Sequence, residues 1–323
     1  MKKNILNLQM FAGNPNPNTT GTLSNEMRTY YSDYIVDYAA PNLVHDQFGQ
    51  KQNIPEGGGN TIHFRKFSPL PKVTSILSEG VTPDGGSMNV SKATATLSQY
   101  GYYLTLSDVL TLTSIDNTLL EATQLLGKQA GQALDNITRE VINGGTNVIY
   151  AGGSAEAREL INSENKITVE DIYKAARFLK NQNAPKIDGG YVAIIHPDVA
   201  YDLMRDPEWI DAHKYSATTE LFEGEIGKIA GIRFVETTEA KIFQGNSCNV
   251  YSTLVLGANA YGVTELTGGG LQTIIKQLGS GGAADPLNQR ATCGWKALKT
   301  AVRLVENYLI RIESASTFNS IPN

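Results

Sequence analysis

The sequence predicts an α+β protein organised around one long helix, without the regular alternation of a doubly wound parallel sheet. Apolar residues between positions 115 and 142 recur at steps of three and four, which places them on one helical stripe. The chain after residue 190 is strand-like in short pieces, and helical and strand-like segments mix without a fixed order. No internal repeat occurs at periods of about 20 to 50 residues.

Length and composition favour two domains and self-association. The chain has 323 residues, and only 18% are charged, so neutral polar groups or other chains must cover much of the surface. Its 15 tyrosines suit half-buried positions at interfaces. The net charge of −5 and the lack of a basic run argue against a dedicated nucleic-acid reader, although an acidic wall can still enclose nucleic acid.

The cysteines and the N-terminus indicate a reducing, cytoplasmic setting. Cys248 and Cys293 form no C-x-x-C pair, which makes a disulfide framework or a zinc site improbable. Met1-Lys2-Lys3 is typical of a signal-peptide start, but polar residues interrupt the apolar core that should follow. No later stretch reaches the roughly 18 apolar residues of a membrane span. We therefore expect a soluble protein made in the cytoplasm.

The first 60 residues are predicted to be an arm with little core of its own. The stretch Asn14-Pro15-Asn16-Pro17-Asn18 is extended and breaks any helix, and an amphipathic piece follows from Ser24 to Tyr38. Such an arm is either disordered or lies along another surface.

A long β-hairpin is predicted next. Thr61 to Phe67 alternates, and a returning strand runs from Ala93 to Leu106, with the turn-rich stretch Ser78 to Asn89 between them. No third strand is near in sequence. Because an isolated two-stranded ribbon is marginal in water, we expect another subunit or the arm to cover it.

The long helix is predicted over 115–142, about 40 Å at 1.5 Å per residue. Thr118 with Glu121 fits a capping box, Gly144-Gly145 supplies left-handed dihedrals at its end, and Gly127 and Gly131 are candidate bending points. The predicted buried stripe comprises Ile115, Leu119, Ala122, Leu126, Ala130, Ala133, Ile137 and Val141.

The remaining elements are shorter. Thr168 to Leu179 is predicted to be a capped amphipathic helix, and strand Tyr191–Ile195 leads into a helix that starts at Pro197. Further strands are predicted over 229–235, 250–256 and 271–278, with one or two over 300–312.

No candidate site carries a recognisable chemical motif. His196 before Pro197 fits a helix-entry residue better than a catalytic base. Carboxylates and a histidine near residue 210 fit a solvated loop edge better than a metal site or an acid–base site. The three glycine clusters fit turns better than phosphate-binding loops, because no P-loop lysine follows any of them. We predict no catalytic, cofactor-binding or metal residue, and hence a structural protein. The residues considered are Asp206, Glu208, Asp211 and His213, with glycines at 57–59, 268–270 and 279–282.

The order of parts resembles the major capsid proteins of tailed double-stranded DNA bacteriophages with the Hong Kong 97-like fold, and more closely the phage N4-type capsid family. The strings that carry the resemblance are IPEGGGNTIHFR at 54–65, SEGVTP at 78–83, SQYG at 98–101, GTNVIYAGG at 145–153, HPDVAYDL at 196–203, GEIGKIAGIRFVET at 224–237 and DPLNQRATCGWK at 285–296. The opening LNLQMFAG at 6–13 is similar to capsid proteins of phages of Gram-positive bacteria.

The resemblance implies an N-terminal arm at 1–56, an extended loop at 57–112, a peripheral domain with a spine helix at 113–190 and 295–323, and an axial domain at 191–294. It also implies hexamers and pentamers of an icosahedral virion capsid around double-stranded DNA, assembled in the host cytoplasm. The implied partners are other copies, a portal, and scaffolding or decoration proteins, with no membrane.

Some features of the fold's type member are not carried over. No long helical segment precedes the arm, which implies a separate scaffold or none. Lys72 and Lys92 lie in the hairpin, but no surrounding motif matches the Lys–Asn cross-linking chemistry of the type member. An encapsulin-like compartment with protein cargo is the alternative that keeps the fold. An enzyme or binding module without a linear motif is the alternative from another class.

Overall fold

The computed structural model describes residues 44–55, 57–67, 85–109, 118–153, 155–214, 225–265, 270–277 and 285–318, together with positions 70, 72, 74, 76, 79, 80, 82, 279 and 280. Most of the predicted arm, residues 1–43, lies outside them. The chain divides into two compact units: Met1–Leu43, Ser98–Leu134 and Gly268–Leu298 in unit 1, and Val44–Leu97, Asp135–Thr267 and Lys299–Asn323 in unit 2.

Unit 1 contains the first part of helix α3 (Thr118–Asn143), strands β4 (Ser98–Ser107) and β12 (Gln272–Lys276), and the first part of the long strand β13 (Arg290–Arg303). β12 runs antiparallel to β13, and β4 also pairs with β13. Trp295 Nε1 donates a 2.6 Å hydrogen bond to Gln129 Oε1, which joins β13 to α3.

Two glycines allow β4 and β13 to approach closely. A Cβ atom at Gly294 would lie 2.7 Å from the Cβ of Tyr103, and one at Gly101 would lie 2.7 Å from the carbonyl oxygen of Trp295. Any side chain at these positions would push the two backbones apart. The SQYG and ATCGWK strings therefore include positions that this strand pairing requires.

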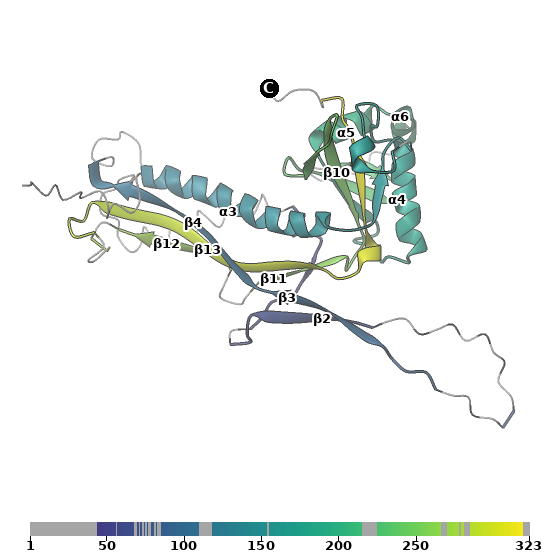
Figure 1. Ribbon diagram of the computed structural model, residues 1–323, viewed down its shortest axis with the longest axis horizontal. Helices are drawn as coiled ribbons and strands as arrows, with labels where there is room; N and C mark the ends of the chain where they lie inside the picture. The colour runs from purple at the N-terminus through teal and green to yellow at the C-terminus, as the bar shows by residue number, and fades with distance from the viewer. Residues whose placement is uncertain are drawn as a thin grey trace, which may run out of the picture. The chain divides into compact units, whose positions relative to one another are not determined.

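The centre of unit 2 is a seven-stranded mixed sheet in the order β5-β14-β10-β6-β8-β7, with β9 paired to β10 (Figure 1). Its strands are β5 (Val148–Tyr150), β6 (Tyr191–Ile195), β7 (Glu225–Ile229), β8 (Ile232–Glu236), β9 (Ile242–Gln244), β10 (Asn249–Leu256) and β14 (Leu309–Ser314). Every residue of β6 and β14 is buried, as in a sheet covered on both faces.

The helices of unit 2 bury their apolar sides in the same core. They are α4 (Val169–Asn181), α5 (Pro197–Met204) and α6 (Pro207–Lys214), with short 3₁₀ turns η3 (Arg158–Leu160) and η5 (Glu306–Tyr308). Ile172 and Leu179 of α4 and Val199 of α5 are fully buried in one cluster with the strands. The predictions of a capped helix after Thr168 and of a helix that starts at Pro197 are confirmed.

Unit 2 also carries the hairpin and a second small group of strands. β11 (Tyr261–Glu265) pairs antiparallel with the last residues of β13, and the two-residue β1 (Gln50–Lys51) pairs in parallel with β11. Strands β2 (Thr61–Phe67) and β3 (Val90–Thr96) pair only with each other among the described residues, and they form a separate ribbon (Figure 1). The predicted isolated hairpin is thus confirmed.

Several predicted strand boundaries were wrong. The returning strand of the hairpin is interrupted at Leu97, so that β3 stays with β2 while β4 joins β13. Residues 229–235 are the end of β7, a tight turn and β8, because Ala230 and Gly231 both have positive φ, as a type I′ turn requires. β11 was not predicted, and β13 begins at Arg290 instead of 300.

The long helix is confirmed, but its buried stripe rotates along its length. Leu119, Ala122, Leu126 and Ala130 are buried as predicted. Ala133, Ile137 and Val141 are only half-buried, and the buried positions in this half of the helix are Leu134, Asp135, Thr138, Ile142 and Asn143. Leu134, Thr138 and Ile142 are shifted by one residue from the predicted stripe, or about 100° around the helix. Three polar residues, Asp135, Thr138 and Asn143, are therefore turned inward.

The C-terminal end of α3 differs from the prediction, and the predicted N-terminal capping lies outside the described residues. The capping box depends on the side chain of Thr118 and on residues 111–117, which are outside the described part of the chain. Gly144 and Gly145 do not have positive φ. Instead, a Cβ at Gly144 would lie 2.5 Å from the Arg303 guanidinium, and one at Gly145 would lie 2.7 Å from the Leu309 side chain. Both contacts are with the ends of flexible side chains, so a side chain at either glycine would make Arg303 or Leu309 shift.

Candidate interaction surfaces

The hairpin has one packed face and one open face. Directly paired residues of β2 and β3 share a face, and the pairs Ile62–Ala95 and Phe64–Ala93 form the packed one. Phe64 is 5% exposed, and a Cβ on Gly262 of β11 would lie 2.8 Å from its ring. Phe64 therefore fastens the base of the ribbon to β11.

The open face carries a basic pair and an apolar pair. All its residues are exposed: Thr61–Thr96, His63–Thr94, Arg65–Lys92 and Phe67–Val90. Large apolar side chains remain exposed at the loop end of the hairpin and in the connecting loop, where nothing described in the chain covers them: Phe67 61%, Leu70 61%, Ile76 97%, Met88 72% and Val90 54%. Clustered apolar exposure of this kind marks an interaction surface.

A groove of about 790 Å³ lies along the hairpin. Arg65, Lys66 and Lys92 contribute its basic lining, and Leu304 and Tyr308 contribute apolar lining. In unit 1, a shallower groove of about 450 Å³ is lined by Tyr102, Tyr103 and Ile274, which are 52%, 59% and 38% exposed. Each unit therefore presents a concave surface with apolar lining.

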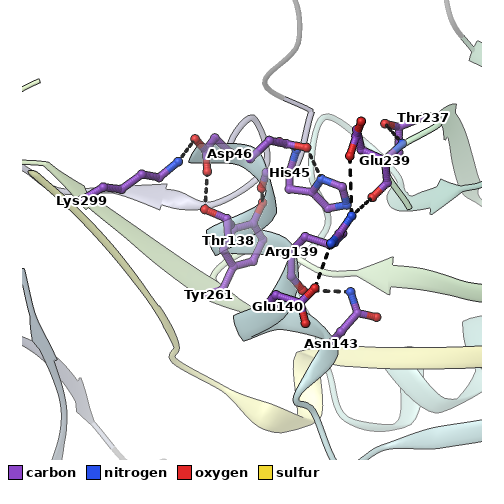
Figure 2. A network of polar contacts seen from close by, with 11 residues as sticks. His45, Asp46, Thr138, Arg139, Glu140, Asn143, Thr237, Glu239, Tyr261 and Lys299 are labelled. Carbon is purple, nitrogen blue, oxygen red and sulfur yellow. Dashed lines mark hydrogen bonds and ion pairs between the residues drawn. The ribbon is translucent and has the colours of Figure 1, made fainter. Parts of the chain in front are cut away.

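A buried polar network, here called the arm clamp, fixes residues 45–46, which lie just after the part of the predicted arm that is outside the described residues. It comprises His45, Asp46, Asp135, Thr138, Tyr261 and Lys299. Figure 2 shows Lys299 and Thr138 converging on the carboxylate of Asp46. Thr138 Oγ1 donates to Asp46 at 2.6 Å, and Lys299 forms an ion pair with the same carboxylate.

The second half of the clamp holds His45. Its backbone N–H donates to Asp135 Oδ1 at 2.7 Å, and its Nδ1 lies 2.6 Å from Asp135 Oδ2. The Tyr261 hydroxyl donates to the carbonyl oxygen of His45, and burial raises the pKa of Tyr261, so that it stays a neutral donor. Because its carboxylates, the lysine and the two hydroxyl groups are paired, the clamp specifies one position for residues 45–46 against α3 and β13. The Nε2 of His45 is buried without a hydrogen-bond partner among the described residues.

Two further ion networks hold the edge of unit 2. Arg158 and Arg311 both donate to the buried carboxylate of Glu313, and the hydrogen bond from Arg158 to Glu313 raises the pKa of Arg158. Burial acts to raise the pKa of Glu140, but its hydrogen bonds with Lys241 and Arg139 outweigh burial and lower it. These networks link α3, β9, β14 and η3 within unit 2.

The residue singled out as a possible catalytic group, His196, is the N-cap of α5. Its Nδ1 accepts a 3.2 Å hydrogen bond from the Asp198 N–H, and its ring lies 5.0 Å from that of Tyr251. Burial lowers the pKa of His196, against the raising effect of the Asp198 charge. The helix-entry interpretation is therefore confirmed.

The acidic cluster near residue 210 was predicted to be a loop edge, and this was wrong. Residues Pro207–Lys214 form helix α6. Asp206 precedes it and accepts hydrogen bonds from the N–H groups of Glu208 and Val169, both at 3.0 Å. Glu208 and Asp211 are exposed. Pro207 suits a first helical position, which explains why a loop-like composition forms a helix. Within the described ranges, no group of three or more His, Cys, Asp or Glu could hold a metal.

The glycine clusters and cysteines behave as structural residues where the structure describes them. Gly57, Gly59 and Gly279 have positive φ, and Gly57 and Gly279 lie in turns, as predicted. Cys248 and Cys293 are free thiols, and burial raises the pKa of both. No helix in the described part of the chain is both long and apolar enough to cross a membrane. Sequence reasoning missed the arm clamp, whose only sequence signal is a pair of polar residues, Asp135 and Thr138, one helical turn apart.

Comparison with known proteins identifies this architecture. The family model described as phage capsid protein matches residues 91–308, more than half of the chain. The capsid of Ralstonia phage GP4 superposes with a TM-score of 0.68 at 14% identity, covering 86% of this chain and 90% of that one. The cyanophage Pam1 capsid reaches 0.69 at 11% identity with 99% and 100% covered, and the mature capsid of bacteriophage PhiM1 reaches 0.61 at 14% with 98% and 93% covered. Curated protein sequences give no significant match.

An extended hairpin, a long helix and a mixed α+β unit together define a shell protein with the Hong Kong 97-like capsid fold. The chain belongs to the phage capsid protein family. It is a capsid shell subunit of a tailed phage, as the resemblance implied. The family match favours this over the encapsulin-like compartment and over an enzyme.

Proposed function

We propose that the chain assembles into hexamers and pentamers of an icosahedral capsid around double-stranded DNA, and that it does so without enzymatic activity. The observation that carries the proposal is the isolated β2–β3 ribbon, whose open face and exposed apolar residues have no cover within the described chain. A ribbon of this kind is stable when a neighbour covers it.

The domain assignment follows from the same proposal. The hairpin region 57–112 is the extended loop over a neighbouring subunit, and α3 with 113–190 and 295–323 is the peripheral domain. Residues 191–294 form the axial domain at the five-fold and six-fold axes. The arm clamp supports this assignment, because it fixes residues 45–46 of the arm at 1–56 against α3.

Further partners belong to the proposal. A portal, and scaffolding or decoration proteins, complete the shell, which is assembled in the cytoplasm of the host. No cofactor, metal or membrane takes part. The low net charge suits a wall that encloses DNA without sequence-specific binding.

The test is deletion of residues 73–89 from the hairpin, with light scattering and electron microscopy of the purified particles. We expect a folded subunit that does not close shells, because many modest interfaces must add up in a shell. Normal particles from the deletion would refute the role of the hairpin. Wild-type shells that carry protein cargo and no nucleic acid would favour a compartment instead of a virion.

A further inference from the structure

The open face of the hairpin contains an unpaired basic site. Arg65 and Lys92 stand directly opposite each other, and neither makes an ion pair with any described residue. Like charges at directly opposed positions destabilise a ribbon. In a protein of net charge −5, an anionic partner would remove this repulsion.

An apolar pair lies next to the basic pair on the same face. Phe67 and Val90 follow two residues further along the strands, about 6.6 Å away at 3.3 Å per residue. A partner that fits both pairs must present a carboxylate and a large apolar side chain at about that spacing.

Helix α3 presents such a combination. Glu121 and Leu125 are both exposed, Leu125 to 61%, and they lie four residues apart, about 6 Å along the helix. Glu121 makes no ion pair with the described residues. Other exposed acidic residues near an exposed apolar side chain lack this combination. Glu170, three residues before Tyr173, already pairs with Lys174, and Glu159 is adjacent to Leu160 and to Arg158. Glu208 and Asp211 lie only one or two residues from Ile210, so they do not share its face of α6.

We infer that the Arg65–Lys92 pair of one subunit binds Glu121 on α3 of a second copy, with Phe67 and Val90 packed on Leu125. The inference rests on the proposed function, since it names the surface that the extended hairpin covers. The contact is heterologous, because the hairpin of one copy meets the helix of the next, and heterologous contacts of this kind close into rings. Each exposed pair contributes little to the free energy of association. Because the contact is repeated around a shell, the summed contributions determine whether the shell assembles.

The test compares two identical substitutions on opposite faces of the ribbon. Lys92→Glu changes the open face, and Lys66→Glu is the matched control, because Lys66 is exposed on the other face. We expect Lys92→Glu to raise the concentration needed for assembly by on the order of tenfold, and Lys66→Glu by less than about threefold. About 1 M salt, where the screening length is about 3 Å, should remove most of the difference.

A charge exchange tests the partner. Adding Glu121→Lys to Lys92→Glu should restore assembly to within about threefold of wild type. Circular dichroism and Trp209 fluorescence of each variant report whether the subunit is folded. Equal effects of Lys92→Glu and Lys66→Glu, or no rescue by Glu121→Lys, overturn the inference. If the wild-type chain forms shells and Lys92→Glu assembles equally well, this inference alone is overturned. If the wild-type chain never forms shells, the proposed function is overturned as well.

Discussion

Replacing Lys299 with alanine removes the cation from the arm clamp and leaves Asp46 buried without its ion pair. The side chains of Lys299 and Asp46 are only 1% and 10% exposed, so water cannot replace the lost partner. Breaking a buried pair from one side costs about 3–5 kcal/mol. The hydrogen bond from Thr138 to Asp46 survives, so we expect the lower end, about 3 kcal/mol.

The two tryptophans make this measurement specific to one unit. Trp209 is buried in unit 2 against Phe234, and Trp295 belongs to unit 1. In a Trp295→Phe background, Trp209 fluorescence reports unit 2 alone. With a urea slope of about 3 kcal/mol/M, Lys299→Ala should lower the unfolding midpoint by about 1 M.

The double variant Asp46→Leu with Lys299→Met provides the control. It removes both charges while it keeps most of the buried volume, so stability should return to within about 1 kcal/mol of wild type. A cost below about 1 kcal/mol for Lys299→Ala would refute the reasoning. A double variant as unstable as the single one would mean that packing of the lysine stem, and not the stranded carboxylate, dominates.

Two further outcomes follow from local geometry. Gly294→Ala should destabilise unit 1 by about 1–3 kcal/mol, followed by Trp295 fluorescence in a Trp209→Phe background, because the new Cβ meets the backbone of Tyr102 and Tyr103. Gly86→Ala, with nothing within 4 Å and no positive φ, is the neutral control, and Trp209 fluorescence in a Trp295→Phe background follows it because Gly86 belongs to unit 2; equal costs would contradict the close-approach argument. The native pKa of His196 lies below its ordinary 6.5, so the unfolded chain binds more protons below that pH, and native stability should fall as the pH drops from about 7 to about 5.5. His196→Asn keeps a capping side chain without that titration and should lose less stability over the same range; an identical pH profile would contradict the assignment.

The comparison of sequence and structure is most instructive along α3. The helix and the buried stripe of its first half were predictable, because Leu119, Ala122, Leu126 and Ala130 follow the helical period. Beyond Ala133 the helical period still predicts that Ile137 and Val141 are buried. The structure instead buries Asp135 and Thr138, because His45 and Asp46 supply their partners and Lys299 forms an ion pair with Asp46. Those partners are distant in sequence, and no local pattern contains them.

In the hairpin and the other strands, too, local features were predictable and the pairing of distant segments was not. Alternation predicted the β2–β3 ribbon and its exposure, and the capped helices at Thr168 and Pro197 followed from local chemistry. The register that places Arg65 opposite Lys92, and the exchange of partners at Leu97, depend on which strands meet in space.

The long helix and the extended hairpin were predictable from the sequence, because helical period, strand alternation and capping are local properties of the chain, and the resemblance of its sequence strings indicated the class of protein. Where polar groups are buried, and where glycine is needed for space, as at Gly294, could be seen only in the folded chain. Burial and close approach are properties of pairs of distant segments, and their free energies appear only when those segments are brought together.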